Sequence, residues 1–167
     1  MFKRFWLGVI YVAVIGVLSN VFAIFINREK LDESKRPFKS KKWEKNGKVY
    51  DKLKIRKWKG KLPDVSKILP FLRTKKVESG TTSKDLRALI KETCVAEIVH
   101  TVLMVLSIGV VFICPGKLGV ILYIFCFIGN LPFILIQRYN RPVLVSLAQR
   151  LEKREERRRN AGTHSVG

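Results

Sequence analysis

Three polar side chains, Thr93, Glu97 and His100, interrupt an otherwise apolar stretch of the sequence. They are four and three residues apart, so on a helix they share one face. In a membrane helix, a carboxylate or imidazole normally faces protein or water, because burial in lipid is costly. There the Glu97 carboxylate would orient the imidazole of His100, which would accept a proton from an attacking hydroxyl. The alternative is that both side chains lie at the membrane interface and hydrogen-bond to neighbouring basic residues.

The Glu-x-x-His spacing also occurs in metal-binding helical bundles, where a second copy and further carboxylates complete the site. This sequence has one copy, and its other histidine, His164, lies near the C-terminus. The thiol of Cys94 is six residues from His100, about 120° away around a helix, so the two do not pair. We therefore expect no metal site, no Cys–His nucleophile and, without a Gly-rich nucleotide loop, no cofactor.

A second polar stripe lies later in the chain. Asn130, Gln137 and Arg141 are seven and four residues apart and share a helical face. Pro132 removes one backbone hydrogen bond beside Asn130 and predicts a kink. The amides suit sugar hydroxyls, and Arg138 or Arg141 suits a phosphate or carboxylate. Alternatively, the two arginines extend to the lipid headgroups.

Three apolar runs, 5–26, 95–113 and 118–136, must carry these side chains. Each is close to the ~20 residues that a helix needs to cross the hydrocarbon core. The chain of 167 residues has 33 Lys and Arg against 13 Asp and Glu, a formal charge of +20, yet 47% of it is hydrophobic. A nucleic-acid-binding protein would share the charge but not the apolar runs. A cleaved signal peptide is the competing interpretation of the first run, which we favour as an anchor because it is long.

The basic residues gather between and after the apolar runs. Residues 28–91 hold 22 Lys or Arg and 8 Asp or Glu, and 138–159 hold eight more basic residues. Positive segments stay on the cytoplasmic side, which predicts a multi-pass cell-membrane protein whose first helix starts outside. Trp43 and Trp58 interleave with lysines, so we expect the middle segment to lie on anionic headgroups. The short alternation at 52–57 leaves helix or strand open there.

The sequence therefore predicts an all-α membrane protein. Leu144, Leu147, Ala148 and Leu151 recur at helical spacing, which predicts a C-terminal amphipathic helix on the membrane surface. The expected segments are an N-terminal transmembrane anchor (1–27), a basic cytoplasmic membrane-surface region (28–91), a transmembrane hairpin with the polar cluster (92–141), and the amphipathic helix with the tail (142–167).

Taken in order, several motifs resemble the glycosyl-4,4′-diaponeurosporenoate acyltransferase family, small bacterial membrane proteins of carotenoid-pigment assembly. The resemblance covers about Asn27 to Leu147. Its motifs are Pro37-Phe38; Trp43-Glu44-Lys45 with Gly47 and Tyr50; Lys57-Trp58-Lys59 with Leu62-Pro63-Asp64; Glu92-Thr93-Cys94 with Glu97 and His100; and Asn130-Leu131-Pro132 followed by Gln137-Arg138-Tyr139-Asn140-Arg141.

The resemblance implies an acyltransferase that esterifies a sugar hydroxyl of a glycosylated carotenoid or related glycolipid with a fatty acyl chain. Its partners would be a lipid acyl donor and a glycosylated lipid acceptor at the membrane, with no nucleic acid. Under this hypothesis His100 is the general base and Glu97 its orienting carboxylate. The candidate substrate-binding residues are Thr93, Asn130, Gln137, Arg138, Arg141, Trp43 and Glu44.

Other possibilities remain open at this level. A different glycolipid or isoprenoid acceptor is equally compatible with the motifs. A non-catalytic membrane subunit that recruits anionic lipid or a partner enzyme would share the same composition. So would a membrane enzyme of another type, such as a reductase or methyltransferase built on a small helical bundle. With three spans, closing an active site could require a second copy of the chain, which leaves a homodimer open.

Overall fold

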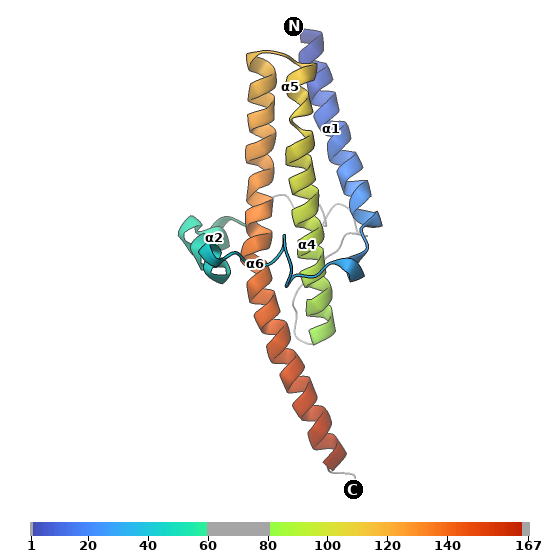
Figure 1. Ribbon diagram of the computed structural model, residues 1–167, viewed down its shortest axis with the longest axis vertical. Helices are drawn as coiled ribbons and strands as arrows, with labels where there is room; N and C mark the ends of the chain where they lie inside the picture. The colour runs from blue at the N-terminus through green and yellow to red at the C-terminus, as the bar shows by residue number, and fades with distance from the viewer. Residues whose placement is uncertain (1, 60–80, 165–167) are drawn as a thin grey trace. The chain divides into compact units, whose positions relative to one another are not determined.

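The computed structural model describes residues 2–59 and 81–164, which contain helices and turns but no strand (Figure 1). The all-α fold class is thus confirmed. The motif Leu62-Pro63-Asp64 lies outside the described residues. The elements are α1 (Phe2–Phe25), the 3-10 segments η1 (Arg28–Lys30) and η2 (Lys42–Leu53), and the helices α2 (Ile55–Trp58), α4 (Ser83–Leu106), α5 (Gly109–Ile113) and α6 (Lys117–His164).

Three stretches of helix are long and apolar enough to cross a membrane: Phe2–Phe25, Ser83–Ile113 and Lys117–Ala161. Each contains or largely overlaps one of the apolar runs seen in the sequence. The second begins well before its apolar run, at Ser83, and the third continues through the segment expected to form a separate amphipathic helix. That segment is therefore the C-terminal part of α6.

The chain divides into two compact units. The first unit consists of residues 1–31 and 94–137, and the second of residues 32–93 and 138–167. The boundary between them falls inside both α4 and α6, so each of these helices contributes one part to each unit. Candidate functional residues occur in both units.

In the first unit, small residues let α1 approach α5, and Figure 1 shows the two helices side by side. A Cβ atom on Gly8 would lie only 3.0 Å from the side chain of Val110. One turn further along α1, the Tyr11 hydroxyl donates to the carbonyl of Leu106 at 2.8 Å. Such small-residue contacts are typical of helices packed in membranes. An apolar cluster closes the other end of α1: Ala23, Val95 and Val99, with Ile26, Leu31 and Leu103 against it.

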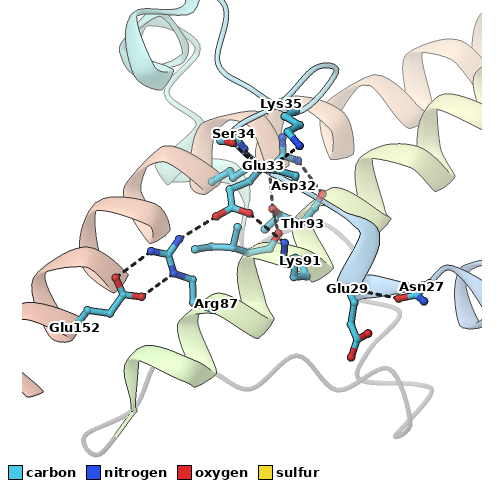
Figure 2. Close-up of polar contacts among 12 residues, drawn as sticks. Asn27, Glu29, Asp32, Glu33, Ser34, Lys35, Arg87, Lys91, Thr93 and Glu152 are labelled. Atoms are coloured by element: carbon cyan, nitrogen blue, oxygen red, sulfur yellow. Dashed lines mark hydrogen bonds and ion pairs between the residues drawn. The ribbon is translucent and has the colours of Figure 1, made fainter. Parts of the chain in front are cut away.

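The second unit has its own core and a belt of ion pairs. Leu86, Ile90 and Ala148 are fully buried, and burial of each of the two larger side chains contributes about 1.5–3 kcal/mol. Four leucine and valine side chains of α6 pack against this core: Leu144, Val145, Leu147 and Leu151. Figure 2 shows Arg87 of α4 bridging two carboxylates, with Glu152 of α6 at 2.8 Å and Glu33 at 2.9 Å.

The basic segment enters this unit as tight turns. Lys45, Asn46 and Gly47 interrupt η2 with positive φ angles. At Gly47, where φ is +87°, a Cβ atom would lie 3.3 Å from the backbone oxygen of Tyr139 on α6. A glycine is required where a left-handed turn meets another backbone so closely. The alternation at 52–57 thus resolves into the end of η2 and the short helix α2.

Candidate functional site

In the first unit, His100 of α4 is held by Asn130 of α6. The ring nitrogen Nδ1 lies 2.8 Å from Asn130 Oδ1. The amide nitrogen of Asn130 donates to the carbonyl of Cys126 at 2.8 Å, one turn back in the same helix. Because that bond fixes which end of the amide faces the ring, Asn130 offers an acceptor and Nδ1 must carry the proton. The lone pair of the neutral imidazole is therefore on Nε2.

An aromatic ring fixes the plane of the imidazole. Phe133, three residues after Asn130, stacks on His100 with ring centroids 4.5 Å apart and 9° between the planes. The imidazole is thus restrained by one hydrogen bond and one ring face, both supplied by α6. A base fixed in tautomer and orientation is what proton abstraction requires.

The expected partner of His100, Glu97, is buried, with only 7% of its surface exposed. Its backbone carbonyl accepts a hydrogen bond from Thr101 at 2.7 Å. The residue that contacts Nδ1 is Asn130 rather than Glu97. The structure thus brings together His100, the candidate base, and Asn130, a candidate substrate contact. Among the described residues, no three His, Cys, Asp or Glu side chains form a group that could hold a metal ion.

In the second unit, Arg141 of α6 is almost fully buried, at 3% exposure. Its Nε donates to Thr93 Oγ1 at 2.9 Å and its Nη2 to the Thr93 carbonyl at 3.0 Å. Its Nη1 donates to the carbonyl of Phe38 at 2.8 Å, and the guanidinium lies 5.3 Å from the Phe38 ring centre. The Thr93 hydroxyl itself donates to the Ile90 carbonyl, which turns its lone pairs toward the arginine. Thr93 and Arg141, which are both candidate substrate-binding residues, thus form one hydrogen-bonded cluster.

In the same unit the buried Glu44 of η2 forms an ion pair with Arg138 of α6, whose side chain is 11% exposed. Arg138 donates to both carboxylate oxygens, through Nε to Oε1 and through Nη2 to Oε2 at 2.8 Å. The backbone N–H of Lys41 and the hydroxyl of Tyr50 also donate to this carboxylate. Burial alone would raise the pKa of Glu44, but these donors, Arg138 above all, lower it to about 2. Burial and the Glu44 carboxylate raise the pKa of Tyr50, so its phenol stays protonated as a donor.

The remaining candidate substrate-binding residues, Trp43 and Gln137, make fewer contacts with the rest of the protein. Trp43 is 57% exposed and meets the ring of Tyr50 edge-on, with centroids 6.1 Å apart. Gln137 is half-buried in the first unit, and no hydrogen bond joins its side chain to another described residue. Cys94 is buried and forms no disulfide with another described residue.

The structure adds residues to the site that the sequence analysis does not include. Phe38 and Tyr50 belong to the family motifs, and that membership is a signal by which they could be found. Phe133 and Ser40 carry no such signal. Only the packing of distant segments shows that Phe133 stacks on an imidazole and that Ser40 lines a pocket.

The fold and the first-unit site define a helical protein with three helices of membrane length and a histidine ring oriented by an asparagine. Residues 34–150 match the family model of glycosyl-4,4′-diaponeurosporenoate acyltransferase. A protein of that name from Staphylococcus aureus (strain bovine RF122 / ET3-1) is 33% identical over 121 residues, 72% of this chain and 73% of the relative. Another, from strain MRSA252, is 36% identical over 124 residues, with the same shares covered. No solved structure matches the chain. The chain belongs to the glycosyl-4,4′-diaponeurosporenoate acyltransferase family and is an acyltransferase by this membership.

Proposed function

We propose that this protein transfers a fatty acyl chain to a sugar hydroxyl of a glycosylated carotenoid or a related glycolipid. Family membership supports the reaction class. The observation that carries the assignment of the base is the contact between His100 and Asn130, which leaves Nε2 as the proton-accepting nitrogen. A glycolipid acceptor also suits a protein with three helices of membrane length.

In the proposed reaction, Nε2 of His100 takes the proton of the sugar hydroxyl as its oxygen attacks the acyl carbonyl carbon. The new carbon–oxygen ester bond forms, and the bond from the acyl carbon to its carrier breaks. The imidazolium then returns the proton to the departing sulfur or oxygen, so no other reactant is consumed. Asn130 keeps Nδ1 protonated throughout, and Phe133 keeps the ring plane fixed. General base catalysis of this kind typically contributes about 10²- to 10⁴-fold in rate.

The membrane setting is part of the proposal. We place the protein in the cell membrane with residues 28–91 and 138–159 on the cytoplasmic side, because these segments hold most of its Lys and Arg. Glu97, Thr93, Gln137, Trp43, Glu44, Arg138 and Arg141 stay candidate positioning or substrate-binding residues. A homodimer also stays a prediction.

The test compares lipid extracts, by mass spectrometry, from cells with the gene deleted, restored, or restored as His100→Ala. The deletion should lose a fatty-acyl glycolipid and accumulate its unacylated precursor. His100→Ala should restore less than about 1% of the product, given the contribution of a general base. Val105→Ala is the matched control, because Val105 lies on the same helix and is 64% exposed. Membrane levels are equalised by immunoblot.

Two outcomes would contradict the proposal. Identical lipid profiles in all strains would show that the chain does not acylate a lipid of these cells. Full restoration by His100→Ala would remove the proposed base and favour the non-catalytic subunit, whose basic surface recruits lipid or a partner enzyme.

A further inference from the structure

The second unit contains a pocket of about 690 Å³. None of the residues assigned a step in the proposed proton transfer lines it. Its walls come from residues 33–46 and from the part of α6 between 138 and 150. Pockets of roughly 300–1,000 Å³ hold ligands of the size of a cofactor or a lipid headgroup. The pocket is therefore large enough for a substrate group.

The charged groups around this pocket favour an anion. Four cations line it, against the two carboxylates of Glu33 and Glu44. Both carboxylates are already bound within the protein. Glu33 pairs with Arg87 at 2.9 Å and with Lys91 at 3.4 Å, and Glu44 pairs with Arg138. Arg87 and Lys91 do not line the pocket, so the charge of Glu33 is balanced from outside it. The surplus charge facing the pocket is positive.

The four cations divide into two kinds. Arg141 is buried and Arg138 is 11% exposed, and both donate to protein acceptors, so they form a fixed wall. Lys39 and Arg150 are exposed, and no hydrogen bond or ion pair joins their charged ends to another described residue. These two side chains can reach a ligand without breaking a hydrogen bond or ion pair to another described residue. They are the cations that an incoming anion would meet.

A buried hydroxyl in the same wall lacks a partner. Ser40 Oγ is inaccessible to solvent and makes no hydrogen bond with any described residue. Leaving such a group unpaired destabilises a folded protein. Ser40 lines the pocket together with Ser146 and Gln149, so a ligand oxygen there would satisfy the hydroxyl. Apolar side chains, among them Phe38, Val143 and Leu147, complete the lining and would face a hydrocarbon part of the ligand.

We propose that this pocket binds the phosphate ester of the acyl donor, through Lys39, Arg150 and the Ser40 hydroxyl. The identification of the ligand as the donor rests on the proposed acyl transfer. Transfer to a sugar hydroxyl without an energy source needs an acyl group already held as a thioester or an ester. Phosphopantetheine thioesters and glycerophospholipids both carry such an acyl group and a phosphate ester. A neutral glycolipid would gain nothing from the surplus positive charge.

The experiment measures equilibrium binding to the purified full chain in a neutral detergent, without turnover. The probes are coenzyme A, dihexanoyl-phosphatidylglycerol, and dihexanoylglycerol as the phosphate-free control. The variants are Ser40→Ala and the pair Lys39→Gln with Arg150→Gln. Arg154→Gln is the matched control, because Arg154 is exposed on the same helix and does not line the pocket.

We expect at least one phosphate probe to bind the unaltered chain. The double variant should weaken that binding about tenfold or more, since it removes two charge-assisted contacts. Ser40→Ala should weaken it about fivefold, and Arg154→Gln less than twofold. Binding of coenzyme A alone would identify the phosphopantetheine source, and binding of the phospholipid alone would identify the lipid source. Binding of both would establish the shared phosphate as the recognised group.

The inference is overturned if neither phosphate probe binds, if the double variant binds as tightly as the unaltered chain, or if Arg154→Gln weakens binding equally. It is also overturned if dihexanoylglycerol binds as tightly as dihexanoyl-phosphatidylglycerol. These outcomes are separate from failure of the proposed function. Phosphate binding in a chain that acylates no lipid would contradict only the transfer reaction, and acylation without phosphate binding would contradict only this pocket assignment.

Discussion

Replacing Glu44 by glutamine should destabilise the second unit strongly, because it removes a buried carboxylate that pairs with a largely enclosed arginine. Glu44 is 1% exposed, and the side chain of Arg138 is 11% exposed. Glutamine has nearly the same shape and still has one carbonyl oxygen. It cannot accept both N–H groups of Arg138 together with the Tyr50 hydroxyl and the Lys41 amide. Arg138 would then stay largely enclosed without a compensating charge in this cluster.

The magnitude follows from the pKa of Glu44. Folding lowers it from 4.5 to about 2, and each pKa unit corresponds to about 1.36 kcal/mol. The folded environment therefore favours the charged carboxylate by about 3 kcal/mol. Removal of one partner from a buried pair costs a similar amount, about 3–5 kcal/mol. We expect Glu44→Gln to lower the free energy of unfolding by about 3 kcal/mol at pH 7.

The same pair predicts how stability depends on pH. Because the pKa of Glu44 is lower in the folded chain, its contribution is complete above the unfolded value of 4.5 and is lost as pH falls toward 2. The unaltered protein should lose about 3 kcal/mol more than Glu44→Gln over this range. The assay is urea unfolding in detergent, followed by tryptophan fluorescence, at pH values between 7 and 2.5.

Two further variants make the result decisive. Glu152→Gln is the matched control, since Glu152 also pairs with an arginine but its side chain is 39% exposed. Because that pair is exposed to solvent, Glu152→Gln should lower the free energy of unfolding far less than Glu44→Gln does. The double variant Glu44→Gln with Arg138→Gln should lose less unfolding free energy than the sum of the losses in the two single variants. A loss below about 1 kcal/mol for Glu44→Gln, or additive losses in the double variant, would refute the reasoning.

Three other substitutions test particular contacts. Gly47→Ala should destabilise the chain by about 1–3 kcal/mol in the same urea assay, because alanine disfavours φ of +87° and its Cβ would crowd Tyr139; an unchanged midpoint would contradict this. Arg87→Gln should cost at most about 1 kcal/mol, and less in high salt, because the ion pairs are partly exposed; a loss that salt does not alter would argue against it. Asn130→Leu should reduce acyl transfer about tenfold or more, because no side chain then holds the proton on Nδ1 of His100. Normal activity at a normal protein level would exclude this role for Asn130.

The helices could be predicted from the sequence because each apolar run carries its own signal. The runs 5–26, 95–113 and 118–136 are long enough that hydropathy alone places them in helices, whatever surrounds them. The continuity of α6 was harder to predict. Its apolar first part and its amphipathic second part differ in pattern but are joined without a helix-breaking turn. Pro142 lies inside α6, and the helix continues past it to His164.

The site could be predicted only in part, because its contacts join residues far apart in the chain. The spacing of polar residues singled out His100, Asn130, Arg138 and Arg141 as candidates. It could not show that Arg138 pairs with Glu44, 94 residues away. Helical periodicity compares a residue only with neighbours on its own helix, so it favoured Glu97 as the partner of His100. The partner in the structure belongs to another helix.

The use of arginine at both 138 and 141 has a physical reason in the second unit. Arg138 donates to the carbonyls of Pro37 and Lys39 as well as to the Glu44 carboxylate, and Arg141 donates to the carbonyl of Phe38. Two side chains one turn apart on α6 thus hold a segment by its backbone, whatever side chains that segment bears. A lysine has a single charged nitrogen, so it could not donate in one plane to several acceptors as the guanidinium group does. The side chains at Lys39 and Ser40 are consequently not needed to attach the segment, which leaves them available for a ligand in the pocket.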